Sequence, residues 1–146
     1  GDGGDQDARQ DMMPSLVTSY NDDDLLATDK TTADDNFDEQ NPLYKSFAQY
    51  AQLYQQYPVL RHGIQTIRYA QNSPGIFAMT KHLANNTQAD MLIVFNSAES
   101  EQQVSLNILG SNQYQTIYGD RNSLTRSNNK ITVTIPALSF AIYQQK

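Results

Sequence analysis

Residues 90–109, DMLIVFNSAESEQQVSLNIL, contain two strand-forming runs separated by a short polar turn. The first run, residues 90–96, is rich in β-branched and aromatic side chains, which favour extended backbone. In the second run, residues 102–109, apolar and polar side chains alternate with a period of two, as in a strand that buries one face. The intervening SAESE has the composition of a hairpin turn, so this stretch predicts an antiparallel β fold.

The same pattern continues on both sides and predicts seven strands between residues 64 and 146. They are expected at residues 64–70, 75–82, 90–96, 102–109, 113–118, 130–135 and 138–144. Short strands with turns at close intervals are typical of an antiparallel sandwich or barrel, and we expect a Greek-key β-sandwich. Alternation assigns eight side chains to its interior, namely Ile93, Phe95, Val104, Leu106, Ile131, Val133, Phe140 and Ile142.

One helix is expected before the strands, because residues 41–58, NPLYKSFAQYAQLYQQYP, repeat large apolar side chains at helical spacing. The repeating side chains are Leu43, Phe47, Tyr50, Tyr54 and Tyr57. Asn41 is a suitable N-cap, Pro42 fits the first helical turn, and Pro58 ends the helix. We therefore predict a helix over residues 42–57 whose apolar stripe packs against a large neighbour.

The segment before the helix is predicted to be irregular, since Gly, Asp, Asn, Ser and Thr dominate it. Residues 1–40 carry twelve of the sixteen acidic residues and two basic ones, a net charge of −10, whereas residues 41–146 have a net charge of +4. The basic residues of the second part are scattered singly, so we expect no nucleic-acid partner. No apolar run has membrane-spanning length, and we expect no membrane partner. The chain thus divides into an acidic segment (1–41), a helix (42–57), a linker (58–63) and an all-β domain (64–146).

Catalytic and metal-binding patterns are not found in the sequence. Glycoside hydrolysis needs two carboxyl groups facing each other about 5–10 Å apart, but Glu99 and Glu101 fall in the expected turn. His62 and His82 each stand alone, and the absence of Cys removes thiol and zinc–thiolate chemistry. The acidic stretch NDDDLLATDKTTADD invites a calcium interpretation but lacks the Gly and Glu that an EF-hand loop requires. We therefore expect neither a catalytic residue nor a metal site in this chain.

Carbohydrate stacking in this chain would depend mainly on tyrosine, because the chain contains nine Tyr and no Trp. By alternation, Tyr114 and Tyr118 share one face of their expected strand. They are the candidates for a sugar-stacking surface, with packing in the core as the alternative.

Several stretches resemble parts of α-amylases of glycoside hydrolase family 13. Residues 1–15, GDGGDQDARQDMMPS, resemble the loop that follows the last barrel strand in one group of these enzymes, where an Ala-Arg-x-Asp-Met segment occurs. Residues 41–63 resemble the closing barrel helix, with its Pro-Leu-Tyr start and its Pro-x-Leu-Arg-x-Gly exit. The stretches GIFAMTK, LIVFNSAE and IPALSFAIYQ are similar to strands of the family's C-terminal β domain.

This resemblance implies that residues 1–41 form the eighth β/α connection of a TIM barrel, close to the substrate cleft. Arg9 and Asp11 match the loop motif and are candidates for shaping that cleft, with bracing of the loop as the alternative. The family's catalytic carboxylates lie on earlier barrel strands, so no residue of this chain inherits their roles.

The chain is therefore expected to be the non-catalytic C-terminal part of an α-amylase-like glycoside hydrolase that acts on α-1,4-glucans. The resemblance implies a secreted or periplasmic parent enzyme, whose missing catalytic barrel is the main partner of this chain. It implies no cofactor here, and any calcium would belong to the rest of the parent. The alternative is a stand-alone carbohydrate-binding or adhesion module with a β-sandwich fold.

Overall fold

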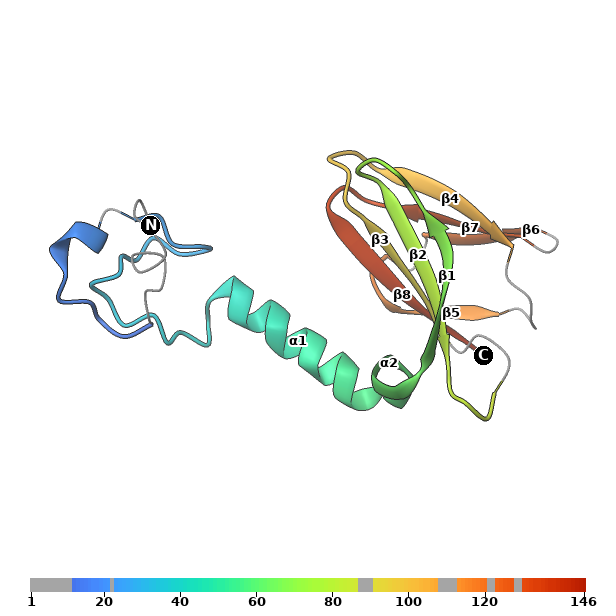
Figure 1. Cartoon of the computed structure of the whole chain (residues 1–146), viewed down its shortest axis with the longest axis horizontal. Coiled ribbons are helices and arrows are strands. Elements are labelled where there is room, and N and C mark those ends of the chain that lie inside the picture. The colour runs from blue at the N-terminus through green and yellow to red at the C-terminus, as the bar shows by residue number, and fades with distance from the viewer. Residues whose placement is uncertain (1–11, 22, 87–90, 108–112, 121–122, 128–129) are drawn as a thin grey trace. The chain divides into compact units, whose positions relative to one another are not determined.

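The computed structural model describes residues 12–21, 23–86, 91–107, 113–120, 123–127 and 130–146, which divide after Gln56 into two compact units (Figure 1). The first unit contains a 3₁₀ turn at Thr18–Tyr20 and helix α1 at Pro42–Gln56. The second contains the short helix α2 at Pro58–His62 and the strands. The strands are β1 (Ile64–Ala70), β2 (Ile76–His82), β3 (Met91–Asn96), β4 (Gln102–Asn107), β5 (Tyr114–Tyr118), β6 (Leu124–Ser127), β7 (Lys130–Ile135) and β8 (Ser139–Gln145).

Helix α1 begins at Pro42, directly after the capping residue Asn41. The Asn41 side-chain oxygen accepts a hydrogen bond from the Leu43 backbone N–H at 2.8 Å, and Pro42 is the first helical residue. The helix ends at Gln56, shortly before Pro58, which has no N–H to continue the hydrogen-bond pattern. The predicted helix therefore agrees with α1 to within one residue.

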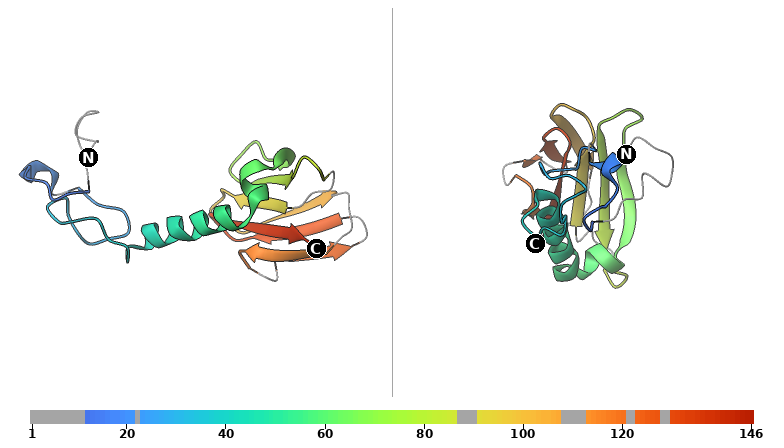
Figure 2. Two further views of the ribbon diagram at one scale, coloured as in Figure 1. Left: turned by 90° about the horizontal axis from the view of Figure 1, so that it is seen from below. Right: turned by 90° about the vertical axis from the view of Figure 1, so that its left-hand side faces the viewer.

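The strands form two antiparallel sheets (Figure 2). Sheet A has the order β1-β2-β3-β8-β5, and sheet B has the order β4-β7-β6. This arrangement confirms the expected mainly β, Greek-key sandwich. The connection from β3 to β4 corrects one expectation, because SAESE does not close a hairpin. It carries the chain from sheet A to sheet B, so Glu99 and Glu101 lie on a crossing between the sheets.

Two segments differ from their sequence-based assignment. Strand β6 lies in a stretch that was expected to be a loop, since its residues LTRS are mostly polar. The expected linker over residues 58–63 contains α2, which packs on β2. In α2, Pro58 stands at the first turn, and the Gly63 N–H donates to the Val59 carbonyl at 2.9 Å.

The hydrophobic core lies between the two sheets. Its buried members are Ile76, Ala78, Leu92, Val94, Val104, Leu106, Ile131, Val133, Ile135, Ala141 and Tyr143. The interior assignment is therefore confirmed for the four side chains on β4 and β7, which are Val104, Leu106, Ile131 and Val133.

The interior assignment is wrong for Ile93, Phe95, Phe140 and Ile142, on β3 and β8. In β3 the core receives Leu92 and Val94, and in β8 it receives Ala141 and Tyr143. Because successive side chains of a strand point to opposite faces, the four misassigned residues lie on the face of sheet A that points away from sheet B. We call this face the outer face of sheet A. The error arose because β3, MLIVFN, is apolar on both faces, so alternation does not distinguish them.

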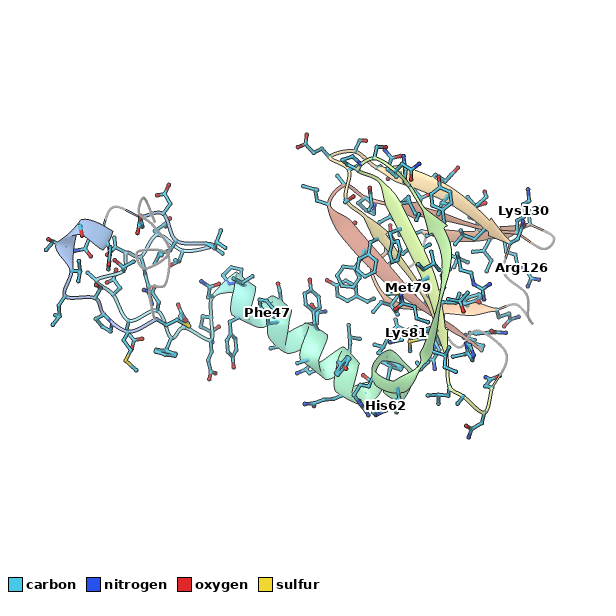
Figure 3. The ribbon with its side chains drawn as sticks, viewed as in Figure 1. Phe47, His62, Met79, Lys81, Arg126 and Lys130 are labelled. Atoms are coloured by element: carbon cyan, nitrogen blue, oxygen red, sulfur yellow. The ribbon has the colours of Figure 1, made fainter. Side chains whose placement is uncertain are left out.

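Helix α2 lies against one end of this outer face (Figure 3). The Lys81 ammonium group on β2 donates to the Leu60 carbonyl at 2.6 Å. Lys81 follows Met79 on the face of β2 that is opposite to Ile76 and Ala78 of the core. Met91, directly across from Lys81 on β3, is completely buried. The outer face of sheet A is therefore covered at the end where α2 lies.

Candidate functional site

Four aromatic rings follow one another across the outer face of sheet A, and we call them the aromatic row: Tyr118, Phe140, Phe95 and Phe77. The ring centroids of Tyr118 and Phe140 lie 4.6 Å apart, and those of Phe140 and Phe95 lie 5.4 Å apart. Both pairs are stacked, with interplanar angles of 18° and 26°. Phe95 and Phe77 are tilted by 35° with centroids 6.3 Å apart. The row thus crosses β5, β8, β3 and β2, four neighbouring strands of the sheet.

Strand register brings these rings together. Phe77 lies opposite Phe95 in the β2–β3 pair, and Phe95 lies opposite Phe140 in the β3–β8 pair. In β5 the pairing shifts by one residue between Thr116 and Tyr118, which leaves Ile117 as the extra residue of a β-bulge. After this bulge Tyr118 lies on the outer face, where its ring stacks on Phe140.

Sequence reasoning missed the row as a unit, although its members are visible in the sequence. Aromatic side chains recur in three strands that were expected, at Phe77, Phe95 and Phe140. Which of them share a face depends on the pairing of strands that are far apart in the chain. That pairing has no local signal, so the row could be found only with the sheet order known.

The row is partly exposed and presents ring edges at its centre. Phe95 is 37% exposed, and the other three rings are partly buried. Phe140 has Tyr118 stacked on one side and Phe95 on the other, so neither of its flat faces is free. Stacking of a sugar ring requires a free aromatic face, and the middle of the row offers none. The row is instead an apolar ridge.

Tyr114 and Tyr118 do not share a face, contrary to the expectation from alternation. Tyr114 packs against the core between the sheets, and burial raises the pKa of its hydroxyl above the ordinary value. The hydroxyl oxygen is buried and has no hydrogen-bond partner among the residues that the structure describes. The bulge at Ile117 separates the two tyrosines, because it adds one residue between them. Sugar stacking by these residues stays a prediction, and their geometry restricts it to Tyr118.

The apolar stripe of α1 is a second exposed surface. None of the fifteen residues of α1 is buried. Leu43, Phe47, Tyr50 and Tyr54 are 44%, 65%, 38% and 52% exposed, and Figure 3 labels Phe47 on this helix. An amphipathic helix is stabilised mainly by packing its apolar face against another element. In the described part of the chain, this stripe is left largely exposed.

The acidic segment is held together by hydrogen bonds and not by a core. The Thr32 hydroxyl donates to the Tyr20 carbonyl at 2.8 Å, and the Ser15 N–H donates to the Thr32 carbonyl at 2.7 Å. Thr32 is only 3% exposed, whereas Leu16 and Leu26 are 98% and 78% exposed. The segment therefore has a defined local arrangement but leaves its large apolar side chains in solvent.

A cavity of about 760 Å³ lies between the acidic segment and the first turns of α1. Its lining residues are Met12, Leu25, Leu26, Thr28, Thr32, Asn36, Phe37, Asp38, Glu39, Asn41, Leu43, Tyr44 and Phe47. The pKa of Asp38 is lowered, chiefly because its carboxylate accepts the Gln40 backbone N–H at 2.8 Å, with Lys30 nearby at 3.6 Å. Most of the lining is apolar, so the cavity suits an apolar occupant.

The polar candidates from the sequence are dispersed. Arg9 and Asp11, the residues proposed to shape a cleft, lie outside the described residues. Glu99 and Glu101 are exposed, and no group of three or more His, Cys, Asp or Glu side chains in the described part of the chain could hold a metal ion. None of the described helices is long and apolar enough to cross a membrane.

Comparison with known proteins gives one close sequence relative and several similar folds. Over 144 residues, 97% of its length, the chain is 36% identical to an α-amylase of Streptomyces lividans, and it spans 16% of that protein. The fold is similar to part of a debranching enzyme of Nostoc punctiforme, with a TM-score of 0.59, 19% identity, and coverage of 80% of this chain and 26% of that one. It is also similar to AmyP, solved in complex with maltotriose, with a TM-score of 0.61, 14% identity, and coverage of 77% and 22%. No protein-family model matches the chain.

Proposed function

We propose that this chain, which corresponds to the C-terminal portion of an α-amylase of glycoside hydrolase family 13, is the non-catalytic part of a larger enzyme that hydrolyses α-1,4-glucans. In that enzyme the acidic segment and α1 complete the catalytic barrel, and the β-sandwich supports it. The catalytic carboxylates belong to the remainder of the enzyme. This chain contributes packing surfaces and no reacting group.

The exposed stripe of α1 is the observation that carries this proposal. Burial of a large apolar side chain stabilises a protein by about 1.5–3 kcal/mol, and α1 leaves a whole row of them in solvent. The α-amylase match covers nearly all of this chain but 16% of the relative, so a large remainder is available to cover the stripe. We therefore assign the stripe to the surface by which α1 packs on the barrel.

A supporting role for the β-sandwich agrees better with its surface than a sugar-binding role. The alternative, a stand-alone carbohydrate-binding or adhesion module, needs aromatic faces that are free to stack on sugars. Tyr114 packs on the core, and the ring of Phe140 is covered on both sides. Tyr118 and Phe77 stand at the two ends of the row, and each lies beside one other ring of it.

The similarity to α-amylases also supports a place of action and a partner. We assign the parent enzyme to the secreted or periplasmic proteins, with starch-like glucans as its substrate and the catalytic barrel as the partner of this chain. We assign no cofactor to this chain, and any calcium of the parent would be held by other residues.

The experiment compares the 146-residue chain with the longer protein encoded together with its upstream sequence. Both are assayed for reducing ends released from soluble starch, and bound protein is measured on insoluble starch. We expect turnover only from the longer protein. Turnover by the 146-residue chain that persists through repeated purification would overturn the proposal, as would an inactive longer protein. Tight starch binding by the 146-residue chain would favour the carbohydrate-binding module.

A further inference from the structure

We propose that the β-sandwich binds a small oxoanion, of the phosphate or sulfate type, at the buried hydroxyl of Tyr114, with Arg126 and Arg68 supplying the positive charge. This site is separate from the proposed function, because all three residues belong to the sandwich and none takes part in glucan hydrolysis.

Arg126 points into the sandwich from β6, an edge strand of sheet B. In the β6–β7 pair it lies directly opposite Ile131, which is buried in the core. Residues directly opposite each other in an antiparallel pair share a face of the sheet, so Arg126 is directed toward sheet A as Ile131 is. Leu124, two residues earlier in β6, packs against the core and agrees with this orientation. Figure 3 labels Arg126 on this strand.

Arg68 is directed inward by a β-bulge in β1, an edge strand of sheet A. The pairing of β1 with β2 shifts between Ile67 and Tyr69, which leaves Arg68 as the extra residue. The Arg68 Nε donates a hydrogen bond to the Thr80 hydroxyl at 2.7 Å. Thr80 is completely buried, and it lies on the same face of β2 as Ala78 of the core. The side chain of Arg68 therefore reaches the interior side of sheet A.

Tyr114 lies at the end of sheet A that Arg68 approaches. Strand register forms one row across the core face of the sheet, made of Thr80, Leu92, Tyr143 and Thr116. Tyr114 is the inward-pointing residue of β5 that comes next to this row, two residues before Thr116. Its hydroxyl is buried and has no hydrogen-bond partner among the residues that the structure describes.

The electrostatic surroundings of the Tyr114 hydroxyl are positive. Burial raises the pKa of this hydroxyl, and the charges of Arg68 and Arg126 act against the rise. In the described part of the chain, these two arginines are the charged groups that act on it. Buried polar groups in folded proteins nearly always have a hydrogen-bond partner, from the protein or from bound water. A hydroxyl with positive charge around it favours a negatively charged partner.

The donors present suit an oxoanion. A tyrosine hydroxyl donates one hydrogen bond, and a guanidinium group has a planar set of N–H donors that fits the oxygens of phosphate or sulfate. Both arginines are exposed, so the ligand can enter between them and the solvent. Inward charges on edge strands also oppose pairing between molecules, but that role does not require a buried hydroxyl beside them.

Titration calorimetry with sodium phosphate tests the site in the 146-residue chain, at neutral pH and with sodium chloride keeping the ionic strength constant. The variants are Tyr114→Phe, which removes only the hydroxyl, and Arg126→Gln and Arg68→Gln. Lys130→Gln is the matched control, since Lys130 precedes the inward Ile131 in β7 and points to the outer face of sheet B. It removes one positive charge without changing the interior.

We expect one phosphate to bind per chain, with an affinity that falls at least about tenfold in Tyr114→Phe and in each arginine variant, because each loses a charge-assisted hydrogen bond. Lys130→Gln should change the affinity by less than about threefold. Phosphate should also raise the free energy of urea unfolding of the unchanged chain but not of Tyr114→Phe.

An absence of phosphate binding would overturn the proposal, since water would then be the partner of the hydroxyl. Equal weakening by Lys130→Gln and Arg126→Gln would also overturn it, because binding would then reflect general attraction to a positive surface. So would an unchanged affinity in Tyr114→Phe, which would place the anion away from the hydroxyl. None of these results depends on the amylase activity of the longer protein.

Discussion

The side-chain amide of Asn96, at the end of β3, donates a hydrogen bond to the backbone carbonyl of Pro136, just after β7, at 2.8 Å. The same amide also lies within hydrogen-bond distance of the Ile135 carbonyl, at 3.1 Å, and its oxygen accepts the Ala98 N–H at 2.9 Å. Asn96 is 3% exposed. One buried side chain therefore connects sheet A to sheet B where the chain passes between them.

Replacement of the Asn96 side chain should lower the free energy of unfolding. Asn96→Ala leaves buried carbonyl groups without their donor, and each unsatisfied buried group costs about 1–3 kcal/mol. We expect the free energy of unfolding in urea to fall by at least about 2 kcal/mol. Gln103→Ala removes an exposed amide and should change it by less than about 0.5 kcal/mol. Equal effects of the two substitutions would mean that Asn96 does not join the sheets.

Strand β3 provides a matched pair of substitutions on its two faces. Leu92 is completely buried in the core, whereas Phe95 is 37% exposed on the outer face. In the 146-residue chain, Leu92→Ala should lower the free energy of unfolding by about 2–5 kcal/mol, as for other core positions. Phe95→Ala should cost less than about 1.5 kcal/mol, because solvent already reaches the ring. A larger loss at Phe95 than at Leu92 would reverse the assignment of faces.

Gly119, directly after β5, has a backbone angle φ of +98°, which side chains disfavour. A Cβ atom there would also lie 2.8 Å from the Ala141 Cβ. Gly119→Ala should therefore destabilise the chain by about 1–3 kcal/mol in thermal or urea unfolding. A double-mutant cycle with Ala141→Gly separates the contact from the backbone strain. A neutral Gly119→Ala would show that the backbone adopts another conformation at this position.

The buried hydroxyl of Tyr143 is expected to make the chain less stable at alkaline pH. Its side chain is completely buried, its hydroxyl is hydrogen-bonded to Ser123, and burial raises the pKa of that hydroxyl. Below about pH 10 the Tyr143 hydroxyl keeps its proton in both the folded and the unfolded state, so its contribution to the free energy of unfolding is fully present. As pH rises above the unfolded value, the unfolded state ionises first and stability falls until the folded pKa is passed.

Tyr143→Phe should reduce this alkaline slope and cost about 1 kcal/mol at neutral pH through the lost hydrogen bond. Urea unfolding between pH 7 and pH 11 measures both effects. Identical slopes for the variant and the unchanged chain would contradict the role of Tyr143.

Local signals were sufficient to predict α1 and most strands. The helix is marked by the cap at Asn41 and by Pro42 and Pro58, whose effects act within a few residues. Strand β7 was predicted with its exact bounds, because Ile131, Val133 and Ile135 alternate with polar residues.

Features that depend on pairing between distant segments could not be predicted. Strand β6 has no apolar periodicity, and it forms because it pairs with β7, with Leu124 opposite Val133. Both faces of β3 are apolar, so its sequence does not show which face points to the core. The position of sheet B decides this. The aromatic row requires the β2-β3-β8-β5 order, which the chain completes only after four crossings between the sheets.

The bulge at Ile117 determines which face of the sheet the Tyr118 ring occupies. With this extra residue, Tyr114 lies in the interior of the sandwich and Tyr118 on its surface, although four residues separate them. A regular strand of the same length would direct both tyrosines to the same face, so the extra residue alone, and no difference in side chain, separates the outward ring from the inward one. Deleting Ile117 would remove the bulge and leave Tyr118 next after the inward Thr116, still on the outer face, so the spacing between the two tyrosines can change by one residue while the aromatic row is kept.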